Sequence, residues 1–162
     1  MKINSAFRHE SGPSEKYEWL TPPNIINALG PFDLDPCSPV KRPWPTAEHH
    51  LTKEDDGLLL PWFGMVWLNP PYGNASLPWM RKMLQHGNGI ALTFARTDTT
   101  VFHECVFGRA AGLLWLKGRL NFYSTNGKRA GNAGSPSVLI AYGTWALKRL
   151  EKCNLEGHIT HA

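Results

Sequence analysis

Apolar runs alternate with amphipathic segments between residues 64 and 116, and this alternation constrains the fold more than any other feature. The apolar run Gly64–Leu68 is bounded by turn residues, a pattern typical of a buried central strand. The segment predicts three strands and two helices in turn: Gly64–Leu68, 76–87, Ile90–Phe94, 99–107 and Leu113–Leu116. Because helices separate the strands, we expect right-handed crossovers and a parallel sheet in an α/β fold.

Shorter elements flank this segment. Residues 22–29 predict a helix in which two prolines occupy the first turn, and Phe32–Asp35 predicts a short strand. The proline-rich stretch 36–53 predicts an irregular connection. Two further strands, Leu120–Tyr123 and Val138–Tyr142, are separated by a glycine-rich loop that suits an antiparallel hairpin, and a helix follows from Thr144. We therefore expect a mostly parallel sheet with a C-terminal antiparallel hairpin.

The length of 162 residues suits one domain. We expect a flexible arm at 1–17, one domain at 18–154 and a polar tail at 155–162. The hydrophobic content of 42% excludes a disordered chain, and the longest apolar stretch is broken by Pro61, so no membrane span is expected. The N-terminus lacks the apolar region of a signal peptide, and three widely spaced cysteines favour a reducing cytoplasm. The net charge of +4 permits nucleic-acid binding.

A four-residue motif, Asn69-Pro70-Pro71-Tyr72, follows the strongest strand. Open α/β sheets bind ligands at the carboxyl ends of their strands. The motif suits methylation of a planar amino group. The Asn69 side-chain oxygen and the Pro70 carbonyl can accept hydrogen bonds from the two N–H groups of the amine, and Tyr72 offers a flat surface on which a flipped base can stack. Asn-Pro and Pro-Pro are also common turn sequences, so a strand-to-loop turn without a chemical role is the alternative.

Together with other short motifs, this one resembles the small phage-type DNA N6-adenine methyltransferases of the Dam kind. The resemblance covers about Tyr17 to Tyr142. Its motifs occur in one order: WLTPP at 19–23, FDLDPC at 32–37, DDGL at 55–58 with Trp62, VWLNPPY at 66–72, RTDT at 96–99 and KGRLNF at 117–122. It implies a small Rossmann-like fold, S-adenosylmethionine as the methyl donor and double-stranded DNA as the substrate. A bacterial host cytoplasm and a monomeric state are also expected.

The resemblance also implies roles for particular residues. Thr21 and Pro22 look like the element that touches the methionine end of the donor. Asp33 and Asp35 are similar in position to carboxylates that hold its ribose hydroxyls or amino group. Asp56 resembles the acidic residue that contacts the donor adenine, with Leu58 packed on that ring. The sequence departs from the family pattern in lacking a glycine-rich first loop after an early strand.

Several cations and polar residues are candidates for DNA contacts. Because Arg96 and Thr97 follow a strand that ends at the same sheet edge as the motif, Arg96 can reach a phosphate there; Asp98 or Thr99 capping the next helix is the alternative explanation of that segment. The alternative explanation for the remaining candidates is that they only keep the protein soluble, as most exposed cations do. These candidates are Lys128 and Arg129 in the loop between the last strands, and Lys41 and Arg42, which with Trp44 could line a groove.

Three other functions remain open. One is an amino-methyltransferase that acts on RNA or on a protein glutamine, although those enzymes usually have the glycine-rich loop that this chain lacks. Another is an inactive nucleic-acid-binding module. The third is methylation of a ring carbon with Cys37 as nucleophile. No metal is predicted, because the histidines and cysteines lack metal-binding spacings such as CxxC or HExxH.

Overall fold

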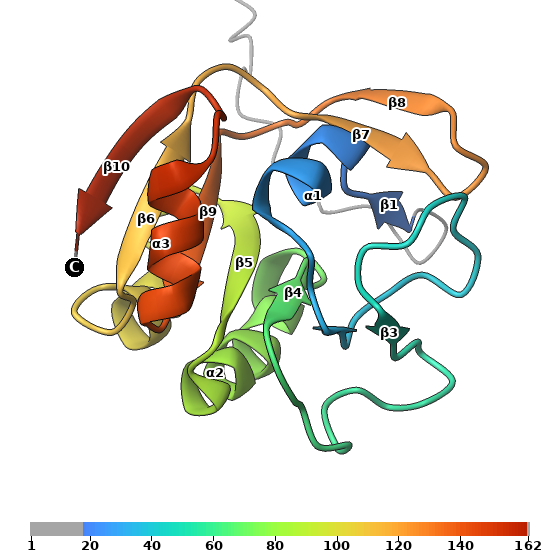
Figure 1. The fold of residues 1–162 in the computed structure, drawn as a ribbon, viewed down its shortest axis with the longest axis horizontal. Helices are drawn as coiled ribbons and strands as arrows, with labels where there is room; N and C mark the ends of the chain where they lie inside the picture. The colour runs from blue at the N-terminus through green and yellow to red at the C-terminus, as the bar shows by residue number, and fades with distance from the viewer. Residues whose placement is uncertain (1–17, 162) are drawn as a thin grey trace, which may run out of the picture.

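A seven-stranded sheet forms the centre of the computed structural model, which describes residues 18–161 (Figure 1). Its strands in chain order are Leu34–Asp35 (β2), His49–His50 (β3), Val66–Leu68 (β4), Gly89–Phe94 (β5), Gly112–Leu116 (β6), Ser137–Tyr142 (β9) and Gly157–His161 (β10). They lie side by side in the order β10, β6, β9, β5, β4, β2, β3. The arm expected at 1–17 falls outside the described residues.

The sheet is mixed, which confirms the α/β class but not a mostly parallel arrangement. Strands β3, β2, β4 and β5 are parallel to one another, as the strand–helix–strand pattern predicts. Strand β9 lies between β5 and β6 and is antiparallel to both, so β6 runs in the same direction as β5. Strand β10 is antiparallel to β6 and occupies the edge. The segment 155–162, expected to be a polar tail, therefore contains the last strand of the sheet.

The hairpin predicted near the C-terminus pairs the wrong strands. Strand β7 (Asn121–Ser124) pairs with β8 (Arg129–Asn132) and with β1 (Trp19–Leu20) in a separate antiparallel sheet, while β9 joins the large sheet. The loop that was expected to connect β7 to β9 contains β8. An Asn126-Gly127 turn closes this shorter hairpin, where Gly127 has a φ of 79° and the Asn126 side chain accepts from the Lys128 backbone N–H.

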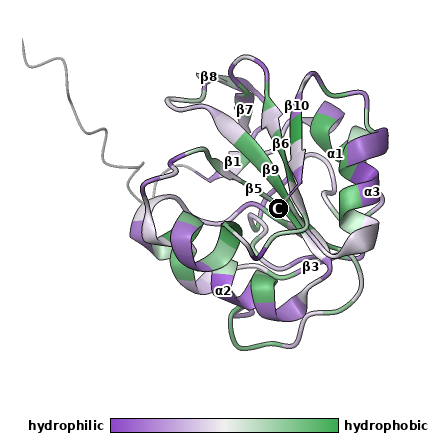
Figure 2. Ribbon diagram, turned by 90° about the vertical axis from the view of Figure 1, so that its left-hand side faces the viewer, coloured by the Kyte–Doolittle hydropathy of each residue, from purple (hydrophilic) through white to green (hydrophobic). Residues whose placement is uncertain are grey.

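Helices cover both faces of the large sheet. Helices α1 (Pro23–Leu29) and α3 (Thr144–Lys152) pack on one face, and α2 (Ser76–His86) with the π-helical turn Phe102–Val106 packs on the other. The predicted helix at 99–107 is therefore reduced to a short turn. Helix α2 ends at His86 and is capped by Gly87, whose φ of 71° is left-handed. In Figure 2 the central strands are hydrophobic and much of the surface of α3 is hydrophilic.

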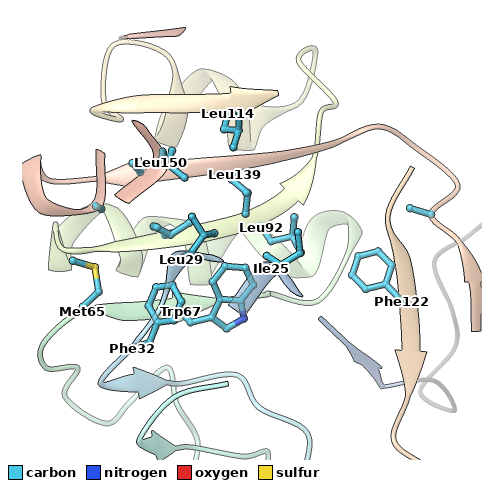
Figure 3. Close-up of a cluster of buried hydrophobic side chains, with 14 residues drawn as sticks. Ile25, Leu29, Phe32, Met65, Trp67, Leu92, Leu114, Phe122, Leu139 and Leu150 are labelled. Carbon is cyan, nitrogen blue, oxygen red and sulfur yellow. The ribbon is translucent and has the colours of Figure 1, made fainter. Parts of the chain in front are cut away.

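The core on the α1 face is centred on Trp67 of β4, which is fully buried. Figure 3 shows its indole beside Phe32, with Leu29, Ile25 and Leu92 close by and Leu139 beyond them. The neighbouring residues Val66 and Leu68 point to the opposite face, so β4 is buried on both sides as its apolar sequence predicts. The strand that precedes the Asn69 motif is thus fixed in the middle of the molecule.

The described residues include no helix that is both long and apolar enough to cross a membrane.

Candidate functional site

The carboxyl ends of β2, β4 and β5 meet at one edge of the large sheet, which we call the carboxyl edge. Asp35 ends β2, Asn69 follows β4, and Phe94 ends β5. The three strands are parallel neighbours, so these residues share an edge although they are far apart in the sequence. This arrangement matches the position at which open α/β sheets bind ligands.

The Asn69 side chain is half-buried and contacts the segment between β1 and α1. Its Nδ2 donates to Oγ1 of Thr21 over 3.4 Å, a contact between residues 48 positions apart. Thr21 is only 2% exposed, and its carbonyl accepts from the Trp44 indole N–H at 3.2 Å. The structure therefore brings together the two predicted site segments, Thr21-Pro22 and Asn69-Pro70. The following Pro71 is exposed.

Tyr72 packs against other aromatic rings at this edge. Its ring stacks on Phe94 with centroids 4.4 Å apart and planes 9° apart, and it meets Phe122 of β7 edge to face at 6.3 Å. Burial raises the pKa of the Tyr72 phenol above its usual value. The phenol oxygen is buried and has no hydrogen-bond partner among the described residues. One face of the Tyr72 ring is thus occupied by Phe94.

Asp35 is a buried carboxylate at the end of β2, only 3% exposed. It accepts from the Cys37 backbone N–H at 3.1 Å and from the Thr46 hydroxyl. Burial raises the pKa of Asp35 to about 6, although these hydrogen bonds and the Arg42 charge oppose the shift. Burial and the Asp35 charge raise the pKa of the Cys37 thiol to about 12, which disfavours a nucleophilic thiolate there.

Asp33, the other carboxylate predicted to hold the donor, does not lie at the carboxyl edge. It precedes β2, and its Oδ2 accepts from the Met65 backbone N–H at 2.6 Å, just before β4 begins. Its own N–H donates to the Met65 carbonyl at 2.8 Å. Asp33 therefore lies at the opposite edge, called the amino edge here. The predicted role of Asp33 in holding the donor stays a prediction, and its position before β2 does not favour it.

The loop that contains Asp56 and Leu58 is held against the end of β2 at Gly57. A Cβ on Gly57 would lie 2.1 Å from the Pro36 carbonyl oxygen, so only glycine permits this approach. The Gly57 carbonyl accepts from the Trp62 indole and the Lys82 ammonium, and Lys82 also binds the Leu58 carbonyl. Asp56 is exposed and Leu58 half-buried. The Asp56–Leu58 segment is thus adjacent to Pro36, the residue after Asp35.

The candidate DNA-contact residues belong to three segments near the same edge. Lys41 and Arg42 line a shallow groove of about 440 Å³ together with Thr125 and Asn126 of the β7–β8 turn. Lys128 and Arg129 follow in that turn and in β8, and Arg129 is exposed. Arg96 and Thr97 are also exposed. The Arg96 guanidinium lies 5.6 Å from the Phe94 ring centre and donates to the Ser135 hydroxyl.

The residues that hold the 43–50 loop in place could not be predicted from the sequence. His50 Nε2 accepts from the backbone N–H groups of Thr46 and Ala47 at 3.2 and 3.3 Å. Burial and the nearby Arg42 and His49 charges lower the pKa of His50 to about 4, so its ring is neutral at pH 7 and can accept both bonds. No spacing pattern predicts these contacts, because they form only when β3 pairs with β2. Trp44 of this loop also packs edge to face on Tyr123.

No cluster of three or more histidine, cysteine or acidic side chains suitable for a metal ion is found within residues 18–161.

A sequence model of the Dam family, described as DNA N-6-adenine-methyltransferase, matches residues 10–154. The chain belongs to this family. The match includes β1 through α3, and thus the Asn69 motif, Thr21 and Asp35. Neither the curated proteins nor the solved structures gave a significant match. The resemblance found in the sequence is therefore confirmed, and the Dam family implies methylation of adenine in DNA.

Proposed function

We propose that this Dam-family chain transfers a methyl group from S-adenosylmethionine to the N6 amino group of adenine in double-stranded DNA, with short or relaxed sequence specificity. The observation that supports this most directly is the position of Asn69. It follows the buried strand β4 at the carboxyl edge, with its amide nitrogen bonded to Thr21. The amide oxygen is then free to accept from a substrate amine.

Two acceptors activate the amine. The adenine N6 lone pair is delocalised into the ring, so the nitrogen is a poor nucleophile. In our proposal the Asn69 Oδ1 and the Pro70 carbonyl accept hydrogen bonds from the two N–H groups of the adenine amine. These bonds favour a tetrahedral nitrogen with a localised lone pair. That lone pair attacks the methyl carbon in line with the carbon–sulfur bond. The sulfur leaves as a neutral thioether, and the amine loses one proton to solvent.

Aromatic packing at the edge suits a base that has been flipped out of the duplex. Phe94 supports Tyr72 from one side by close stacking, and Phe122 contacts it at a near right angle. The Tyr72 ring is therefore held in one orientation before any base arrives. We assign its remaining face to the target adenine.

The donor-binding roles fit the structure only in part. Asp35 is suited to hold the ribose or amino group, because each carboxylate oxygen has a further lone pair beside the bond it already accepts. We retain Pro22, Asp56 and Leu58 as donor contacts, since Pro22 follows the residue that contacts Asn69 and the Asp56 loop lies against Pro36. The Thr21 hydroxyl is instead bonded to the Asn69 amide, so we do not assign it to the donor. Asp33 is not retained, because it lies at the amino edge.

Cations near the edge are suited to phosphate contacts. The groove lined by Lys41 and Arg42 adjoins the turn that precedes Lys128 and Arg129, and Arg96 extends from the end of β5. We propose that these cations position the duplex through its backbone, which gives affinity without sequence information. Because a length of 162 residues suits one domain and no segment is large enough for a separate recognition domain, we expect a short or relaxed recognition sequence.

The test is direct methylation of unmodified duplex DNA by the purified protein and S-adenosylmethionine, followed by mass spectrometry of the nucleosides. We expect N6-methyladenine, and no product with Asn69→Ala. RNA of the same sequence and a glutamine-containing peptide serve as alternative substrates. N4-methylcytosine, methylated RNA or glutamine alone, or no product would contradict the proposal.

A further inference from the structure

The side-chain amide of Asn69 has two ends with opposite hydrogen-bonding properties. Its oxygen accepts, and its nitrogen donates. If the amide were rotated by 180°, the NH₂ group would face the amine of the substrate and repel it. The proposed function, on which this inference rests, therefore requires the amide to be held in one orientation. Asn69 is half-buried, and its own backbone does not impose that orientation.

We infer that Thr21 is a positioning residue that fixes the orientation of the Asn69 amide. The Asn69 Nδ2 donates to the Thr21 Oγ1 at 3.4 Å. Because Thr21 is only 2% exposed, its hydroxyl has little access to water and requires a protein partner. This contact ties the nitrogen end of the amide to the interior and directs Oδ1 away from Thr21.

The backbone of Thr21 is itself held on both sides. Leu20 pairs with Tyr123 in the small sheet, and the Pro22 carbonyl accepts from the Ile25 N–H in the first turn of α1. The Trp44 indole donates to the Thr21 carbonyl at 3.2 Å. The hydroxyl thus has a fixed position relative to β4, which is what a positioning residue requires.

Thr21→Val tests this inference, because valine has the shape of threonine without the hydroxyl. We expect the turnover number at saturating donor and DNA to fall about tenfold, the usual scale for one hydrogen bond. Donor affinity should change by less than about twofold, and Thr21→Ser should restore most of the turnover. Thr160→Val is the matched control, because Thr160 also bonds one side chain, Trp115, but in the edge strand β10.

The Asn69→Asp background sharpens the test. A carboxylate has two equivalent acceptor oxygens, so it has no wrong orientation. The turnover number of the double variant Asn69→Asp with Thr21→Val should therefore differ by less than about twofold from that of Asn69→Asp alone. An equal loss in both backgrounds would overturn the inference. So would a loss of donor affinity with normal turnover at saturation, because Thr21 would then act on the donor.

A readout without catalysis separates this inference from the proposed function. The side-chain ¹H–¹⁵N signal of Asn69, identified by its absence in Asn69→Ala, should shift in Thr21→Val and remain unchanged in Thr160→Val. An unchanged signal in Thr21→Val would overturn the positioning role. Failure of the wild-type protein to methylate DNA, with the signal shifted as expected, would instead overturn the proposed function.

Discussion

The two edges of the large sheet differ in how their polar groups are used. At the amino edge, side chains bond backbone groups and complete the fold. Asp33 pairs with Met65, the Gly64 carbonyl accepts from His86 and Asn88, and the Leu29 and Pro31 carbonyls accept from Arg149. At the carboxyl edge, Asn69 bonds Thr21 through its nitrogen and keeps its oxygen for a ligand, and the buried Tyr72 phenol has no partner among residues 18–161.

Unpaired buried polar atoms show the same difference. Among residues 18–161 they are Trp67 Nε1, Tyr72 OH, Thr93 Oγ1, Asn121 Oδ1 and Ser137 Oγ. Thr93 lies at the end of β5, Ser137 pairs with Phe94, and Phe122 of β7, which follows Asn121, contacts Tyr72. Burying such atoms without a partner costs free energy, so a fold optimised only for stability would avoid them. Polar residues at the amino edge are therefore expected to affect stability, and those at the carboxyl edge to affect activity.

The largest expected effect is the loss of turnover in Asn69→Ala. Removing one of two acceptors on the amine should lower the turnover number about a hundredfold or more, with a much smaller change in donor affinity. Asn88→Ala is the matched variant at the amino edge, where the side chain donates to the Gly64 carbonyl at 2.9 Å. It should lower the melting temperature and leave turnover of the folded protein unchanged. If Asn69→Ala lost donor binding but kept turnover per bound complex, its assigned role would be wrong.

Asp35→Asn should stabilise the protein while weakening donor binding. The pKa of Asp35 is raised from 3.8 to about 6 in the folded state, so the folded state binds this proton more tightly than the unfolded chain does. Stability therefore falls as the pH rises from about 4 to about 6, and stays lower above that range. Asparagine can accept from the Cys37 N–H and donate to the Thr46 hydroxyl, so it avoids the buried charge.

At pH 7 to 8 we expect a gain in the free energy of unfolding of up to about 3 kcal/mol, and a flatter pH dependence below pH 6. Donor affinity should fall about tenfold or more, since a charge-assisted hydrogen bond is lost. Denaturant unfolding at several pH values and calorimetric titration with S-adenosylmethionine measure the two effects. A variant that is less stable at pH 8 would show that the ionised carboxylate stabilises the fold.

Asp33→Ala should show the reverse pattern. It leaves the Met65 N–H, in a residue that is 6% exposed, without its acceptor, and we expect a loss of about 1–3 kcal/mol in the free energy of unfolding. Donor affinity and turnover of the folded fraction should be unchanged at a temperature below the transition. Weakened donor binding in this variant would return Asp33 to the binding site and contradict the distinction between the edges.

The smallest effect is expected for the double variant Lys128→Ala with Arg129→Ala. It should weaken DNA binding about equally across sequences and lower the salt-dependence slope by about 1.8, or about 0.9 for each phosphate contact. Lys148→Ala with Lys152→Ala removes the same charge from α3, beside the amino edge, and should leave the slope unchanged. A changed set of methylated sites at constant slope would mean that the β7–β8 turn contacts base edges.

Local patterns predicted the central elements well. The apolar run before Asn69 became β4, and the segments around Ile90 and Leu113 became β5 and β6. These strands are buried on both faces, so their sequences alone distinguish them from loops. The Asn69–Tyr72 motif was found for the same reason, because it directly follows such a strand.

Contacts between distant segments were not predictable in this way. Asp33 and Asp35 differ by two positions and belong to opposite edges, because β2 begins and ends within that interval. The partner of β9 depends on long-range pairing, and the glycine-rich loop indicated only that some hairpin is present. The contact of Thr21 with Asn69 arises from the position of α1 on the sheet, which no short motif encodes.

The insertion of β9 between β5 and β6 has a consequence for folding during synthesis. Strand β5 leaves the ribosome long before its antiparallel partner β9, which begins at Ser137. At a synthesis rate of roughly 5–20 residues per second, this delay lasts several seconds. During that time one edge of β5 and the β9-facing edge of β6 are both unpaired, which exposes two apolar strands to aggregation. The nascent chain is therefore expected to be prone to aggregation until β9 has emerged.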